Sequence, residues 1–224
     1  MYRFFVNQRE ENYFILNDEI VNHLKSVRIQ KEEKIICVYQ AKFYICSYDW
    51  KNKIALIEQE LDEDHEYSNN LILCASIIKL KRFEWLIQKA TELGVKEFYP
   101  IITKNTNIKY IQQFDSKFER METIIKNASE QSFRNILMKI HKPITFDEAL
   151  KLNVKTKILA HEKSYVKSSN DFEGDICFYV GPEGGFTQEE IEKSLNQGIQ
   201  IISLGKRILR SETASIYLLS RIKD

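Results

Sequence analysis

Four of the seven glycines of this 224-residue chain gather in two short loops, each of which follows an apolar run. The first loop is Gly181-Pro182-Glu183-Gly184-Gly185, and the second begins at Gly205 and reaches Thr213. Glycine tolerates positive φ and close backbone approach, so the two loops could bind a ligand through main-chain amides and carbonyls. A Pro-Gly turn and a helix N-terminus capped by Ser211 would show the same spacing. The spacing leaves both interpretations open.

Motifs for several common chemistries are missing from the sequence. It contains no G-x-G-x-x-G, no G-x-x-x-x-G-K-[ST] and no G-x-S-x-G. The four histidines and four cysteines have no metal-ligand spacing, so we expect no metal, no disulfide and buried, reduced thiols. His161-Glu162 follows an apolar run and is either part of a ligand site at a strand end or a solvated pair.

From residue 71 onward, uninterrupted apolar runs alternate with amphipathic helices, which is typical of a parallel sheet buried on both faces. Gly94 is expected just after the end of one helix, and the capping box Thr187-Gln188-Glu189-Glu190 is expected to open another. A further helix is expected around residues 121–128 and a last one over 212–222. The predicted strands are residues 71–78, 98–102, 157–160, 176–180 and 199–204.

The first 60 residues have short runs rich in Ile, Val, Tyr and Phe, which indicate strands. One helix is expected over residues 18–27, behind the possible cap Asn17. Together these elements suggest a small β-barrel, and the acidic stretch 62–70 is the best linker candidate. We therefore expect two domains, 1–68 and 69–224, the second of the α/β class. The predicted strands of the first are residues 3–6, 13–16, 35–39, 43–48 and 53–60.

Charge is distributed unevenly along the chain. Residues 71–170 carry 18 basic and 10 acidic side chains, although the whole chain has 33 and 32. Such a stretch suits a polyanion, but Lys-rich solvated helix faces would have the same composition. The longest apolar run, residues 71–78, is far shorter than the ~18–20 residues that span a bilayer. With no apolar signal segment at the start either, we expect a cytoplasmic protein without membrane contact.

Five blocks of sequence stand out by their order and spacing. They are Val180-Gly181-Pro182-Glu183-Gly184-Gly185-Phe186-Thr187; Ser203-Leu204-Gly205-Lys206-Arg207-Ile208-Leu209-Arg210-Ser211-Glu212-Thr213-Ala214; Arg3-Phe4-Phe5-Val6; Gln88-Lys89-Ala90-Thr91-Glu92-Leu93-Gly94-Val95; and Ala128-Ser129-Glu130-Gln131-Ser132 with Arg134. Together they closely resemble the RsmE family, SPOUT-superfamily methyltransferases that methylate N3 of a uridine in 16S ribosomal RNA.

The resemblance implies an N-terminal PUA-like β-barrel that binds RNA and a C-terminal α/β domain threaded into a deep trefoil knot, with a mostly parallel sheet. It further implies a homodimer and S-adenosyl-L-methionine as methyl donor, with S-adenosyl-L-homocysteine as product. By position, the cofactor-binding residues are Ala160, His161, Glu162, Val180, Gly181, Pro182, Glu183, Gly184, Leu204, Gly205, Ile208, Leu209 and Arg210.

The chain departs from the family pattern at several positions. Glu32-Glu33 replaces a usual Gly-Asp, Asn105 replaces a common arginine, and Phe133 replaces the glycine of a Ser-Gly-Arg block. Ser211 stands where threonine is usual, which conserves a hydroxyl. These changes affect expected RNA contacts, whereas the cofactor loops are intact.

Methyl transfer to N3 of uracil requires stabilisation of the negative charge that develops over O2 and O4. Arg210 is the first candidate for this task and Arg207 the second, although Arg210 could instead pair with Glu212. Glu183 and Glu130 are candidates for the general base. Glu183 could instead fix its loop, and Glu130 could pair with Arg134 at i,i+4 spacing.

Contacts with RNA phosphates are expected from basic side chains in both domains. The candidates are Arg3, Arg28, Lys79, Lys81, Arg82 and Arg134. The expected partner is 16S ribosomal RNA within the small ribosomal subunit. Two alternatives are a methyltransferase of the same superfamily that acts on another RNA, and a non-catalytic RNA-binding assembly factor.

Overall fold

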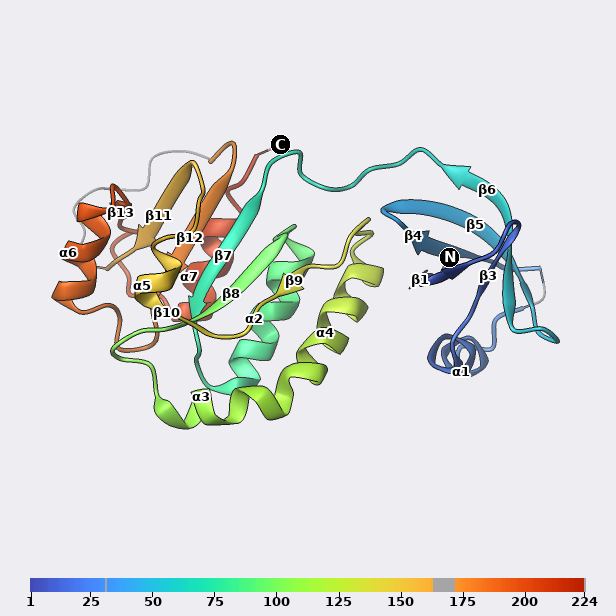
Figure 1. Ribbon diagram of the computed structural model, residues 1–224, viewed down its shortest axis with the longest axis horizontal. Helices are drawn as coiled ribbons and strands as arrows, with labels where there is room; N and C mark the ends of the chain where they lie inside the picture. Colours follow the sequence, from blue (N-terminus) through green and yellow to red (C-terminus); the bar gives the residue numbers. More distant parts are fainter. Residues whose placement is uncertain (31, 163–171, 224) are drawn as a thin grey trace. The chain divides into compact units, whose positions relative to one another are not determined.

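A computed structural model describes residues 1–30, 32–162 and 172–223, which divide into two compact units (Figure 1). The first unit is Met1–Glu66 together with Ser129–Ile136, and the second is Tyr67–Ala128 together with the chain from Leu137 onward. The segment Ser129–Ile136 was not part of the expected first domain. It joins that unit through contacts between residues distant in sequence, which no local pattern indicates.

The first unit is built on a six-stranded sheet with one helix packed on it. The strands, in their order across the sheet, are β1 (Arg3–Phe5), β4 (Lys34–Tyr39), β5 (Lys42–Asp49), β6 (Ile54–Leu61), β3 (Tyr13–Ile15) and β2 (Gln8–Arg9). Only β1 and β4 pair in parallel; the other neighbours are antiparallel. Helix α1 (Asp18–Ser26) buries Ile20, Val21 and Leu24, and Asn17 caps it by accepting a 2.9 Å hydrogen bond from Ile20 N.

The second unit contains a sheet whose described strand pairings are all parallel. Across the sheet the order is β10 (Ile144–Thr145), β8 (Glu97–Ile102), β7 (Leu71–Ser76), β12 (Ile176–Val180), β11 (Thr156–Ala160) and β13 (Gln200–Ile202), and β9 (Lys139–Ile140) also pairs with β8. Strands β7 and β12 are buried at every position, which explains their uninterrupted apolar sequences. The expected α/β class and mostly parallel sheet are confirmed.

Helices cover both faces of this sheet (Figure 1). The helices on one face are α2 (Leu80–Glu92), α3 (Ile108–Phe114), α4 (Phe118–Gln131), after the short 3₁₀ turn η1 (Asp115–Lys117), and α7 (Ser211–Leu219). The other face is covered by α5 (Phe146–Ala149) and α6 (Gln188–Asn196). Gly94 follows α2 at φ +82°, as expected, and a Cβ there would overlap the Tyr67 ring. Among the described residues, no helix has the length and apolar character needed to cross a bilayer.

The strand topology sets the position of the site. Strands β7, β12, β11 and β13 are neighbours and run parallel, so their carboxyl ends meet at one edge of the sheet. Both glycine loops and the His161-Glu162 pair follow strands of this group. An open parallel sheet binds ligands at that edge.

Candidate active site

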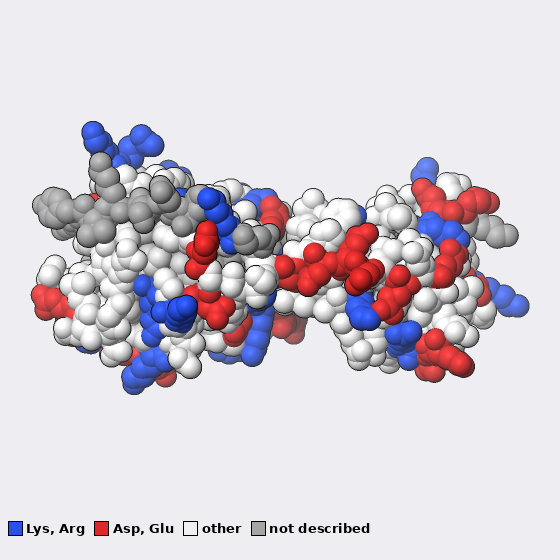
Figure 2. Space-filling view, turned by 90° about the horizontal axis from the view of Figure 1, so that it is seen from above, with Lys and Arg blue, Asp and Glu red and all other residues white. Residues whose placement is uncertain are grey.

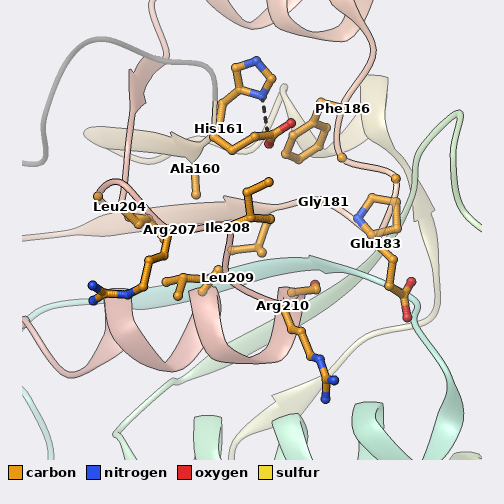
Figure 3. Close-up of a pocket in the computed structure, with 18 residues that line it drawn as sticks. Ala160, His161, Gly181, Glu183, Phe186, Leu204, Arg207, Ile208, Leu209 and Arg210 are labelled. Atoms are coloured by element: carbon orange, nitrogen blue, oxygen red, sulfur yellow. Dashed lines mark ion pairs between the residues drawn. The ribbon is translucent and has the colours of Figure 1, made fainter.

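The loops after β11, β12 and β13 enclose a cavity of about 330 Å³ together with the first turn of α7 (Figure 3). Every residue predicted to bind the cofactor lines this cavity. Arg207, the second candidate for a catalytic residue, also lines it. Four further lining residues, Gly185, Phe186, Ser211 and Ala214, stand in the family sequence blocks but were not assigned to the cofactor.

The loop after β12 is a tight turn that requires glycine. Gly185 N donates a 2.9 Å hydrogen bond to Pro182 O, and Gly185 has φ +65°. A Cβ on Gly181 would lie 3.2 Å from the Phe186 ring. Phe186 is buried and packs on Phe146 with ring centroids 5.1 Å apart. The backbone of this loop therefore forms part of the cavity wall directly.

The loop after β13 carries the most exposed side chains of the site. Gly205 has φ +121°, and the Ile208 side chain is 85% exposed. Arg210 is the N-cap residue of α7, so the alternative in which Ser211 caps this helix is not what the structure shows. The helix begins at Ser211, whose Oγ is buried without a hydrogen-bond partner among the described residues.

The loop after β11 contributes an acidic group. Glu162 Oε2 lies 3.5 Å from Nδ1 of His161, whose side chain is only 13% exposed. A Cβ on Gly185 would lie 3.6 Å from both Glu162 carboxylate oxygens. The pair is thus packed against the β12 loop at the cavity, rather than being a solvated pair remote from the site.

The predicted catalytic side chains point in different directions. Figure 3 shows Arg207 extending away from Arg210 and Glu183, which lie on the other side of the cavity. Arg210 forms no ion pair with any described residue. Instead, Arg82 at the start of α2 lies 3.8 Å from Glu183 and 3.8 Å from Glu212. The alternative of an Arg210–Glu212 pair is therefore not what the structure shows.

The histidines, cysteines and acidic residues of the described part of the chain bear on whether it could hold a metal or a reactive thiol. No group of three or more His, Cys, Asp or Glu side chains there could hold a metal ion. All four cysteines are buried and free. Burial and a hydrogen bond with Cys177 raise the pKa of the Cys74 thiol well above its usual range, so it stays protonated.

Comparison with known proteins decides the family. A family model described as an RNA methyltransferase domain matches residues 65–223. The ribosomal RNA small subunit methyltransferase E of Mesomycoplasma hyopneumoniae (strain 232) is 42% identical over 229 residues, covering 100% of each chain. This chain belongs to the ribosomal RNA small subunit methyltransferase E family.

Other members of the family also match nearly end to end. The Bacillus subtilis (strain 168) member is 29% identical over 99% of this chain and 96% of its own. The crystal structure of a Neisseria gonorrhoeae member bound to S-adenosyl methionine matches with a TM-score of 0.88 and 30% identity, over 98% of this chain and 95% of that one. The resemblance drawn from the sequence blocks is confirmed.

The basic side chains predicted to contact RNA in this family member differ in availability. In the second unit, Lys79 and Lys81 are exposed and form no ion pair with described residues, whereas Arg82 lies between Glu183 and Glu212. The face shown in Figure 2 has blue and red side chains interleaved rather than one continuous basic surface.

In the first unit, two of the predicted phosphate contacts are engaged with the protein itself. The Arg134 side chain is 3% exposed, and its Nε donates to Glu66 at 2.7 Å. Arg3 is half-buried with its guanidinium over the Phe133 ring, and burial lowers its pKa. Arg28 alone of the three is exposed. The Arg134 side chain is therefore too buried to contact a phosphate. Its ion pair with Glu66 instead helps to hold Ser129–Ile136 in this unit.

Glu130, a predicted candidate for the general base, also belongs to the first unit. Its Oε1 accepts a 3.1 Å hydrogen bond from Phe5 N, and it does not line the cavity. Its carboxylate orders the backbone of β1. Of the two predicted base candidates, only Glu183 is placed at the cavity.

Proposed function

We propose that this chain transfers the methyl group of S-adenosyl-L-methionine to N3 of a specific uridine near the 3′ end of 16S ribosomal RNA, within the small ribosomal subunit. The observation that carries the proposal is the cavity, which is formed by the loops whose sequences match the family. The cavity lies at the carboxyl edge of a parallel sheet, and this edge is where α/β proteins bind their ligands.

The residues that line the cavity fit this cofactor. A volume of about 330 Å³ lies within the usual range for sites that bind small organic ligands. Ile208, Leu209 and Phe186 offer apolar surface to an adenine ring, and the glycines expose main-chain donors and acceptors. The buried Ser211 Oγ has an unused hydrogen-bonding capacity, and Glu162 supplies a carboxylate for hydroxyl or ammonium groups.

When bound, S-adenosyl-L-methionine supplies a sulfonium methyl group for in-line transfer. The protein's task is then to orient uracil and to stabilise the charge that develops over O2 and O4 when the N3 proton leaves. We assign this to Arg210, which is exposed at the cavity and unpaired with any described residue. We assign acceptance of the N3 proton to Glu183, because its carboxylate lines the cavity with a side chain 45% exposed.

The domain architecture that we propose is also the one that the family resemblance implies. We propose that the first unit, Met1–Glu66 with Ser129–Ile136, serves as a PUA-like RNA-binding barrel, and that the second unit is a SPOUT domain threaded as a deep trefoil knot. Exposed Trp85, Ile208 and Tyr217 on the second unit support a homodimer, since burying large apolar side chains favours association. We place the protein in the cytoplasm with the ribosomal subunit.

The deciding experiment is methyl transfer from labelled S-adenosyl-L-methionine to small ribosomal subunits that lack the modification, followed by mapping of the labelled nucleotide. We expect label at one N3-methyluridine near the 3′ end of 16S RNA. Cofactor binding without label in these subunits would contradict the proposed substrate and indicate another RNA. Failure to bind the cofactor would contradict the enzyme and indicate a non-catalytic assembly factor.

A further inference from the structure

Asn105, which lies in the loop after β8, contacts the glycine loop of the active site. Its Nδ2 donates hydrogen bonds of 3.0 Å to Gly184 O and 3.0 Å to Gly185 O. The two loops are far apart in sequence and both belong to the second unit. One side-chain amide thus satisfies two consecutive backbone carbonyls.

These two hydrogen bonds restrict the backbone conformation of the glycine loop. They fix the orientation of two successive peptide planes, and the first of these planes also carries the Gly185 N–H that closes the turn onto Pro182 O. The contact is also sterically close, since a Cβ on Gly184 would lie 3.2 Å from Asn105 Cβ. A loop built on two glycines has many alternative conformations, so it gains most from such a constraint.

The loop that carries Asn105 is itself held in place. Lys104 N donates a 2.9 Å hydrogen bond to Glu190 Oε1, and Thr103 N donates one of 2.9 Å to Thr106 Oγ1. Glu190 is 7% exposed and also forms the capping box of α6 with Thr187, immediately after the glycine loop. Asn105 therefore projects from a backbone that is bonded on both sides of it.

We propose that Asn105 is a positioning residue that holds the Gly184–Gly185 backbone in the conformation that binds the cofactor. The inference deepens the proposed function and rests on it for the ligand. Only a side chain with two N–H donors at this reach suits the site, because both partners are carbonyl oxygens. An aspartate would place a negative charge against those oxygens and donate nothing when ionised.

The test compares Asn105→Ala and Asn105→Asp with Asn107→Ala as a matched control. Asn107 lies in the same loop and caps α3 by accepting from Lys109 N, but among the described residues its side chain forms no hydrogen bond with Gly184 or Gly185. The first readout is hydrogen exchange of the Gly185 amide in the protein without cofactor. We expect exchange to accelerate about tenfold in both Asn105 variants, and to stay at the wild-type rate in Asn107→Ala.

The second readout is the dissociation constant for S-adenosyl-L-methionine, measured by calorimetry. We expect it to rise about tenfold in Asn105→Ala and further in Asn105→Asp, with the control within twofold of wild type. Wild-type exchange and affinity in Asn105→Ala would overturn the proposal, as would equal weakening in Asn107→Ala. If the wild-type protein binds no cofactor, the proposed function fails, while the exchange readout still tests whether Asn105 orders the loop.

Discussion

Arg210 stands out among the residues at the cavity because the nearby carboxylates are engaged by another cation. Arg82 lies at 3.8 Å from both Glu183 and Glu212, so the Arg210 charge has no partner among the described residues. A guanidinium without an ion-pair partner can stabilise negative charge that develops on the substrate during the reaction.

We expect Arg210→Ala to lower the rate of methyl transfer by roughly 100-fold, because it removes a donor to the developing oxyanion. The cofactor dissociation constant should change much less, since uracil is the group that Arg210 orients. Single-turnover rates and calorimetry on the same preparations measure the two effects. Lys206→Ala is the control, because that exposed side chain lies in the same loop but does not line the cavity. A wild-type rate in Arg210→Ala would remove its proposed role.

A second residue-scale prediction concerns Glu97 in β8, away from the cavity. Burial raises the pKa of its carboxyl, but hydrogen bonds from Tyr99 and His141, at 2.9 and 2.8 Å, lower it by more. The net folded-state pKa is below the unfolded value of about 4.3. Ionised Glu97 therefore stabilises the folded protein fully at pH values above the unfolded-state pKa. This stabilisation is lost as pH falls through the folded-state pKa.

Glu97→Gln should lower the free energy of unfolding by about 1 kcal/mol at pH 7, because it weakens both hydrogen bonds. The difference from wild type should shrink as pH falls below about 4, where wild-type Glu97 also becomes neutral. Urea titrations in a Trp50→Phe background, in which Trp85 reports on the second unit, measure it. An equal difference at pH 7 and pH 3 would show that ionisation of Glu97 is not involved.

At the residue scale, the spacing of the glycines left a ligand site and a simple turn both open, and the family resemblance supplied the assignment of the cofactor residues. The glycines of the two loops and the residues beside them required no knowledge of distant contacts. Asn105 and Arg82 were not predicted in their observed roles, because their partners lie about 80 to 130 positions away. Ser211 was predicted as a cap from its type alone, but the helix starts at that residue, which moves the cap position to Arg210.

At the scale of elements, the most informative contact is the buried ion pair between Arg134 and Glu66. Both side chains are less than a tenth exposed, and Glu66 also accepts from Asn135 N at 2.9 Å. Phe133, beside this pair, has φ +61°, a conformation that favours glycine. The pair and the contacts around it hold the segment after α4 in a strained backbone conformation.

We expect Arg134→Met to destabilise the first unit by about 3–5 kcal/mol, because it leaves Glu66 buried without its charge partner. Unfolding followed by Trp50 fluorescence in a Trp85→Phe background measures this unit by itself. The matched control is Lys34→Met, which breaks an exposed pair with Glu58 in the same unit and should cost less than about 1 kcal/mol. Equal losses in the two variants would mean that burial of the Arg134 pair has no energetic consequence.

Element prediction succeeded where the pattern was long enough. Strands β1, β3 to β8 and β11 to β13 and helices α1, α2, α4, α6 and α7 were expected from apolar runs and caps, with ends within a few residues, whereas helix α3 was not. Strands β2, β9 and β10 have two residues each and α5 has four, so they carry too little pattern to be recognised. They form because neighbouring strands are already in place.

At the scale of the whole molecule, the distribution of charge along the sequence overstates the free positive charge. Among the described basic residues in 71–170, Arg82, Lys89, Arg120, Arg134 and Lys142 are paired with carboxylates. A count along the sequence cannot separate paired from free cations, because pairing depends on the fold. Lys79 and Lys81, at the start of α2, remain exposed and unpaired among the described residues.

The last prediction therefore concerns Lys79→Gln/Lys81→Gln and the salt dependence of RNA affinity. Each lost phosphate contact reduces the slope of log affinity against log salt by about 0.7 on single-stranded RNA, so the double variant should lose roughly 1.4. The control is Lys34→Gln/Lys42→Gln, since these lysines are already paired with Glu58 and Glu60. Filter binding of a 16S fragment at several salt concentrations measures both slopes. If the slope of Lys79→Gln/Lys81→Gln equals that of the control, RNA phosphates contact another surface.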